Sequence, residues 1–149
     1  MFADYISLML INTMIAYFLL AGYVYSGMND VDQGKWAIGF MMTGFVSLVF
    51  GAYVCLTWPL PGPFNMAYGE MPVLLGIILL GAGSALAKGW DLLAAAWFGF
   101  FAGWAPIIIG VQLIRLKLTS YPMVSGIGFI LSGAASVLAL RSTSGETGW

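Results

Sequence analysis

The chain has 149 residues, of which 61% are hydrophobic and only 7% are charged, and its mean hydropathy is +0.96. Soluble domains carry about 25% charged residues, so this composition excludes a soluble globular protein and predicts an integral membrane protein. The formal net charge of −1 gives no reason to expect a nucleic-acid partner, the single cysteine excludes an internal disulfide, and the absence of histidine removes His-ligated metal and haem sites.

Five apolar segments are long enough to cross a bilayer as helices, which takes about 20 residues each. No lysine or arginine precedes the first segment, which is predicted to be a retained span rather than a signal peptide. We therefore predict a multi-pass, all-α protein of the cell membrane, a bundle of five transmembrane helices in a single domain covering residues 1–149. The predicted spans are residues 5–27, 36–58, 71–87, 92–114 and 121–140, with a polar turn at 28–35.

The segment 58–70, WPLPGPFNMAYGE, is the one long interruption of this apolar pattern. Its three prolines, Pro59, Pro61 and Pro63, remove backbone donors and fix φ, so they predict a loop rather than a helix. The segment ends in Glu70, which leads directly into the third span. The proline loop is therefore expected to present one carboxylate at the head of that span.

Polar residues from several spans are expected at one depth, because five spans place the proline loop and the turn after the fourth span on the same side of the bilayer. Polar groups within a membrane are costly and tend to face a bundle interior or a wet cavity. We predict a vestibule with polar and aromatic walls, formed by Asn12, Glu70, Gln112, Ser125, Tyr68, Trp97 and Trp104, with Arg115 at its edge.

A plainer interpretation of Glu70 is also open. The carboxylate would then lie among the lipid headgroups or cap the third helix, because the N-terminal end of a helix dipole favours negative charge. Arg115 would neutralise it in that arrangement.

Small residues recur four apart on several spans and form ridges that let helix backbones approach closely. The ridges are Thr43, Ser47 and Gly51; Ala95, Gly99 and Gly103; and Gly128, Ser132 and Ser136. They predict tight packing within one protomer or, alternatively, a seam between protomers of a homo-oligomer.

The segments ISLMLIN, TWPLPGPFNMAYGEMPVLLG and ALAKGWDLLAAAWFGFFAG resemble a family of small prokaryotic membrane proteins of unknown function, which implies no activity. A fainter similarity links YGEMPVLLGIILLGAGSALAKGWDLLAAAWFGFFAGWAPIII to a helix pair of the proton-gated urea and short-amide channels. That similarity implies a pore within each protomer and a hexameric ring. The channel family has six spans and a histidine-rich loop, however, whereas five spans are predicted here and histidine is absent.

Two functions are consistent with these features. The first is a channel or facilitator for a small neutral solute of the urea or amide type, working in the lipid bilayer as a homo-oligomer. The alternative is a structural or accessory membrane protein, assembled with itself or with a larger complex and without transport. An enzyme is not expected, because the sequence lacks an acid pair at helical spacing within a span, a phosphate loop and a metal motif. No cofactor or metal is predicted.

Overall fold

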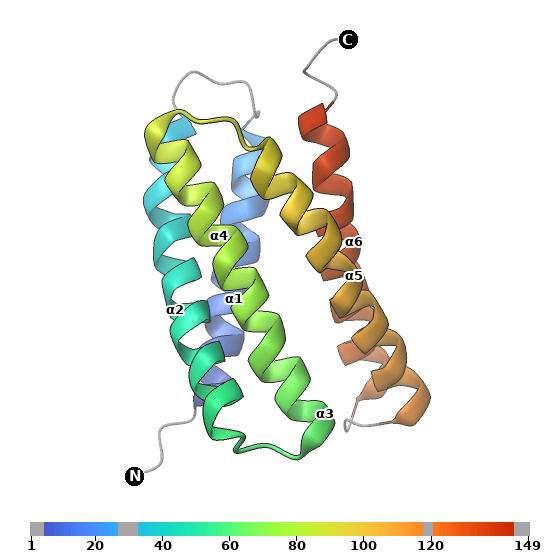
Figure 1. Ribbon diagram of the computed structural model, residues 1–149. Coiled ribbons are helices and arrows are strands. Elements are labelled where there is room, and N and C mark those ends of the chain that lie inside the picture. Colours follow the sequence, from blue (N-terminus) through green and yellow to red (C-terminus); the bar gives the residue numbers. More distant parts are fainter. Residues whose placement is uncertain (1–4, 27–32, 118–120, 145–149) are drawn as a thin grey trace. The chain divides into compact units, whose positions relative to one another are not determined.

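The computed structural model describes residues 5–26, 33–117 and 121–144, and every regular element in these ranges is helical (Figure 1). The long helices are α1 (Tyr5–Tyr25), α2 (Ala37–Thr57), α4 (Met71–Lys88), α5 (Leu93–Leu116) and α6 (Pro122–Ser144). Three short turns accompany them: the 3-10 turn η1 (Gln33–Trp36), the α-helical turn α3 (Gly62–Asn65) and the π-helical turn η2 (Met66–Glu70). Most of the predicted polar turn at 28–35 lies outside the described residues.

The all-helical prediction is confirmed. Four helical stretches are long and apolar enough to cross a membrane: Ser7–Tyr25, Gly34–Thr57, Met66–Lys88 and Leu93–Leu116. A shorter apolar stretch, Pro122–Val137, lies in α6, so a fifth span there stays a prediction.

The non-helical part of the proline loop is shorter than the sequence predicts. Helical backbone resumes at Gly62, and the helical turns α3 and η2 lead into α4 without a break. Pro63 is compatible with this start, because a proline in the first turn of a helix lacks an N–H that has no intrahelical partner there anyway. The third apolar helical stretch therefore includes Glu70 instead of beginning after it.

The chain divides into two compact units, residues 1–91 and 92–149. The first unit contains α1, η1, α2, α3, η2 and α4, and the second contains α5 and α6. The prediction that the whole chain forms a single domain stays a prediction.

In the first unit, α2 and η2–α4 lie antiparallel along a seam of glycines (Figure 1). Gly44 faces Gly76 and Gly51 faces Gly69, and on each helix the two glycines are seven residues apart. A Cβ atom at Gly76 would lie 2.7 Å from the backbone nitrogen of Leu48 and 2.8 Å from the carbonyl oxygen of Gly44. The two backbones are therefore in contact at a distance that only glycine permits.

Asn12 attaches α1 to α2. Its side chain is 7% exposed, and its Nδ2 donates to the Thr43 carbonyl at 3.0 Å and to Ser47 Oγ at 2.8 Å. Farther along the pair, the ring of Tyr23 meets that of Phe40 edge-on with centroids 5.7 Å apart. Buried side-chain hydrogen bonds of this kind hold helices together in lipid, where burial of apolar surface contributes little.

Replacing Asn12 with alanine is expected to lower the free energy of unfolding by about 1–3 kcal/mol, because Ser47 loses its partner in a buried position. Thr13→Ala is the matched control, since the bond that Thr13 Oγ1 makes in the described chain, at 2.8 Å to the Met9 carbonyl, stays within its own helix. Unfolding in detergent, followed by tryptophan fluorescence, measures both. Equal effects of the two substitutions would contradict a role for Asn12 between helices.

The second unit is a hairpin of α5 and α6 with a seam of the same kind. Gly103 faces Gly133 and Gly110 faces Gly126, again seven residues apart on each helix. A Cβ at Gly110 would lie 2.6 Å from the Gly126 carbonyl oxygen. The ridge residues Gly51 and Gly103 thus pack inside their own units, which confirms the prediction of internal packing for these positions.

Candidate functional site

The candidate site is the proline-loop junction, which we define as the last turn of α2, residues 58–61, α3 and η2. The junction begins where Trp58 ends α2 in the left-handed conformation, with φ of 48°. Its N–H donates to the Val54 carbonyl at 3.0 Å, a common way to end a helix although glycine is the usual residue there. Pro59 follows and prevents the helix from continuing.

Asn65 holds the far side of the loop against α2. Both Asn65 and Val54 are 0% exposed, and Asn65 Nδ2 donates to the Val54 carbonyl at 3.2 Å. Asn65 Oδ1 accepts from the Leu60 N–H at 3.4 Å, and the Phe64 N–H donates to the Pro61 carbonyl at 2.9 Å. The Val54 carbonyl therefore accepts from both Trp58 and Asn65, and this fixes where the chain re-enters a helix.

The π turn that follows is explained by Pro72. In an α-helix, residue 72 would donate its N–H to the Tyr68 carbonyl, but proline has no N–H and its ring crowds that carbonyl. The turn widens instead, and the Met71 N–H donates to the Met66 carbonyl. Single π turns of this type occur often at functional sites.

Gly69 lets this wide turn lie directly against α2. A Cβ atom at Gly69 would be 3.0 Å from Cys55 Sγ and 3.1 Å from Val54 Cγ1. The half-buried thiol therefore covers the backbone of the residue next to Glu70.

Glu70 is exposed at the end of the π turn. It is the only acidic residue in the four apolar helical stretches, and it lies four residues from the start of its own stretch, Met66–Lys88. Its side chain makes no capping hydrogen bond within the described residues, and the helix runs through it on both sides. The interpretation of Glu70 as the cap of the third helix is therefore wrong.

The first unit supplies three of the predicted vestibule residues. Tyr68 and Glu70 flank Gly69 in the π turn, and Tyr68 is half-buried. Asn12 is bonded to α2 at Ser47, and the α2–α4 register puts this level about one helical turn deeper than Glu70. Along the helix axis, Asn12 therefore lies within about one helical turn of Glu70. Its amide nitrogen, however, is already bonded to α2.

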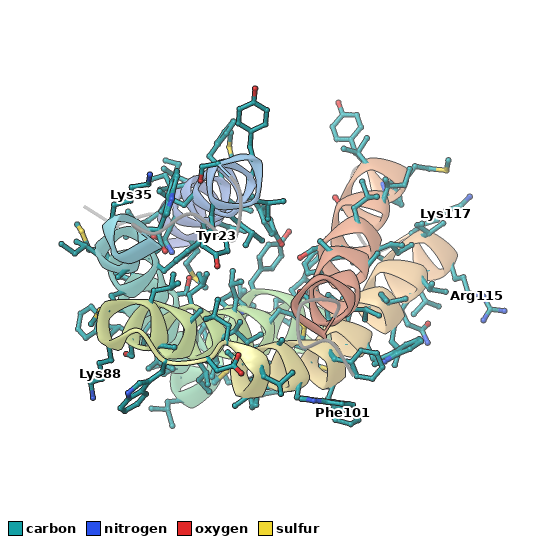
Figure 2. The ribbon with its side chains drawn as sticks, turned by 90° about the horizontal axis from the view of Figure 1, so that it is seen from above. Tyr23, Lys35, Lys88, Phe101, Arg115 and Lys117 are labelled. Carbon is teal, nitrogen blue, oxygen red and sulfur yellow. The ribbon has the colours of Figure 1, made fainter. Side chains whose placement is uncertain are left out.

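The second unit supplies the other five. Trp97, Trp104, Gln112 and Arg115 are exposed on α5, and Ser125 is half-buried on α6. Gln112 and Ser125 lie at the same end of the hairpin, because Gly110 faces Gly126. Figure 2 shows the side chain of Arg115 extending away from α5. A common vestibule across both units stays a prediction.

The aromatic side chains of α5 contact one another along the helix. The rings of Trp97 and Phe101 stack with centroids 6.1 Å apart, and Phe100 meets Trp104 edge-on at 6.4 Å. About half or more of the surface of three of these side chains is exposed: 49% for Trp97, 67% for Phe101 and 50% for Trp104. They form one continuous aromatic face of the second unit.

Sequence reasoning missed Asn65, Val54 and the π turn. Asn65 had a usable signal, since asparagine in a proline-rich turn commonly bonds nearby backbone. The π turn had one in Pro72, which follows Glu70 by only two residues.

Comparisons with known proteins give a family and no activity. The model of a family described as a protein of unknown function, DUF981, matches residues 1–147. No curated protein and no solved structure matches the chain. The resemblance to a family of unknown function is confirmed, and nothing found supports the similarity to urea and short-amide channels.

Proposed function

We propose that this chain, which belongs to the DUF981 family of proteins of unknown function, lets a small neutral solute cross the membrane along the face of α4 that carries Glu70. The solute is of the urea or amide type, whose N–H groups can donate hydrogen bonds to a carboxylate. The observation that carries the proposal is the exposed Glu70 carboxylate inside an apolar helical stretch.

An ionisable side chain in a membrane span is costly and is retained chiefly where it meets water, a partner or a substrate. Glu70 lies about one helical turn from the start of its stretch, because the π turn Met66–Glu70 separates the two. It is exposed and does not cap α4. A wet path that begins at Glu70 would keep the carboxylate solvated.

The same face of α4 continues inward from Glu70. Leu74, Ile77 and Gly81 follow at spacings of four, three and four residues, which place them on one side of a helix. Ile77 and Gly81 are exposed, and Leu74 is half-buried. Within the described residues, nothing lies within 4 Å of a Cβ placed on Gly81. We infer that a small solute passes along this face below the carboxylate, where, among the described residues, Gly81 leaves open space.

The alternative of a purely structural or accessory protein draws on the small-residue ridges. Gly51 and Gly103 of those ridges are occupied by packing inside their own units, and Ser47 is bonded to Asn12. These residues are therefore not free to form a seam between protomers. Association into a homo-oligomer stays a prediction that does not depend on them.

Flux into liposomes tests the proposal. The full chain is reconstituted, and vesicle swelling is followed in gradients of urea, acetamide and glycerol. Faster entry of urea and acetamide than in protein-free vesicles, with less effect on glycerol, is the expected result. Flux equal to that of protein-free vesicles for all three solutes would count against transport.

A further inference from the structure

In the glycine seams of the two units, an added Cβ atom would meet equivalent backbone atoms of the facing helix. A Cβ at Gly51 would meet the nitrogen of Val73 at 2.9 Å and the Gly69 carbonyl at 3.0 Å. In the second unit, a Cβ at Gly110 would meet the nitrogen of Ile130 at 3.1 Å and the carbonyl of Gly126 at 2.6 Å. Val73 stands four residues after Gly69, and Ile130 stands four residues after Gly126. The two contacts are equivalent.

The next contact along each seam agrees as well. A Cβ at Gly76 would meet the nitrogen of Leu48 and the carbonyl of Gly44. A Cβ at Gly133 would meet the nitrogen of Ile107 and the carbonyl of Gly103. In both units, the residue whose nitrogen is met stands four positions after the facing glycine.

The ends of the first helices also match. Trp58 and Lys117 are the only non-glycine residues with positive φ in the described chain, at 48° and 49°. Each stands seven residues after a seam glycine, Gly51 or Gly110, and each donates its N–H to a buried residue four positions back. Two seams and two rare helix ends in the same register are not explained by shared composition.

We infer that α2–α4 and α5–α6 are two copies of one helical hairpin, and that the residues in which their loop ends differ, Tyr68 and Glu70, form the recognition site for an N–H-donating solute. The second part rests on the proposed function. In the first copy Gly69 is flanked by Tyr68 and Glu70, whereas in the second Gly126 is flanked by Ser125 and Ile127.

The first copy is also longer at this end. The chain from Trp58 to Gly69 has two residues more than the chain from Lys117 to Gly126. The extra length is where the prolines, the buried Asn65 and the π turn occur. The carboxylate thus sits on an elaboration of the hairpin that the seam itself does not require.

The pairing of copies supplies a substitution that separates structure from recognition. Ile127 occupies the position that Glu70 occupies in the other copy, so isoleucine is compatible with the seam there. Glu70→Ile should keep the unfolding temperature in detergent and lower urea flux by at least about tenfold, the factor expected for loss of a charged hydrogen-bond partner. Ile127→Val is the control and should change neither quantity.

Two measurements on the full chain decide the two parts separately. Gly51→Ala and Gly110→Ala should lower the unfolding temperature by similar amounts, because their Cβ atoms meet equivalent backbone atoms. A lower unfolding temperature for one glycine variant and an unchanged one for the other would overturn the duplication, whatever urea flux is measured.

Unchanged urea flux in folded Glu70→Ile, with an active wild type, would overturn the recognition site. An unfolded Glu70→Ile would also overturn it, by showing a structural role. An inactive wild type would refute the proposed function and the recognition site with it, and leave the duplication to the glycine variants.

Discussion

Gly76→Leu is expected to prevent the first unit from folding, because a side chain there would have to occupy the space of the α2 backbone. Even the Cβ atom would lie 2.7 Å from the Leu48 nitrogen and 2.8 Å from the Gly44 carbonyl oxygen. Backbone atoms cannot move aside like the end of a flexible side chain, so α2 and α4 would have to separate. Gly76→Ala, the smaller change, should still lower the free energy of unfolding by about 1–3 kcal/mol or more.

Gly81 provides the matched control on the same helix. In the described part of the chain, nothing lies within 4 Å of a Cβ placed there. Gly81→Ala should therefore be neutral or stabilising by up to about 1 kcal/mol, because alanine loses less conformational freedom than glycine in a helix. Size-exclusion profiles and unfolding in mild detergent measure both variants. A tolerated Gly76→Leu, with a monodisperse profile and a normal transition, would contradict the α2–α4 seam.

Glu70→Gln is expected to reduce urea flux by roughly 10-fold to 100-fold, because a hydrogen bond to a charged group contributes about 1.5–3 kcal/mol and each 1.4 kcal/mol is a factor of ten. Glutamine keeps the shape of the side chain but replaces one acceptor oxygen with a donor. A solute that offers N–H groups then meets a donor where it needs an acceptor. Folding should not change, since the Glu70 side chain is exposed and does not cap α4.

Glu70→Asp separates charge from shape. Aspartate keeps both acceptor oxygens one methylene farther from the path, so its flux should lie between those of the wild type and Glu70→Gln. Vesicle swelling with equal amounts of reconstituted protein gives the order. Equal flux in Glu70→Gln and the wild type would show that the carboxylate does not contact the solute.

The long apolar helices could be predicted from the sequence because hydrophobicity and length decide them. The packing could be predicted only in part. The four-residue ridges correctly mark Gly51 and Gly103 as contact points, but the seams repeat every seven residues, because an antiparallel partner meets the same face of the helix after two turns. The sequence of one helix does not determine which other helix packs against its glycine face, because that depends on the tertiary structure.

The structure of the proline loop could also be predicted only in part from the sequence. Three prolines predict a break, and the chain does break at Pro59 and Pro61. Pro63 falls in the first turn of a new helix, where its missing N–H costs nothing, so the same residue type starts one element and ends another. The polar character of Asn12 was recognised from the sequence, but its partners Thr43 and Ser47 depend on how α1 packs on α2.

The central claim is that the α4 face below Glu70 is wet, and thiol labelling in intact vesicles tests it most directly. Single cysteines at Glu70 and Ile77, in a Cys55→Ala background, are exposed to a hydrophilic thiol reagent. Phe45→Cys is the depth control, since Phe45 is 61% exposed on α2 beside Gly44, which faces Gly76. A wet path predicts that positions 70 and 77 both react, that urea protects position 77, where the Glu70 carboxylate is retained, and that position 45 stays unlabelled. Reaction at position 70 alone would place Glu70 among the headgroups and contradict the path.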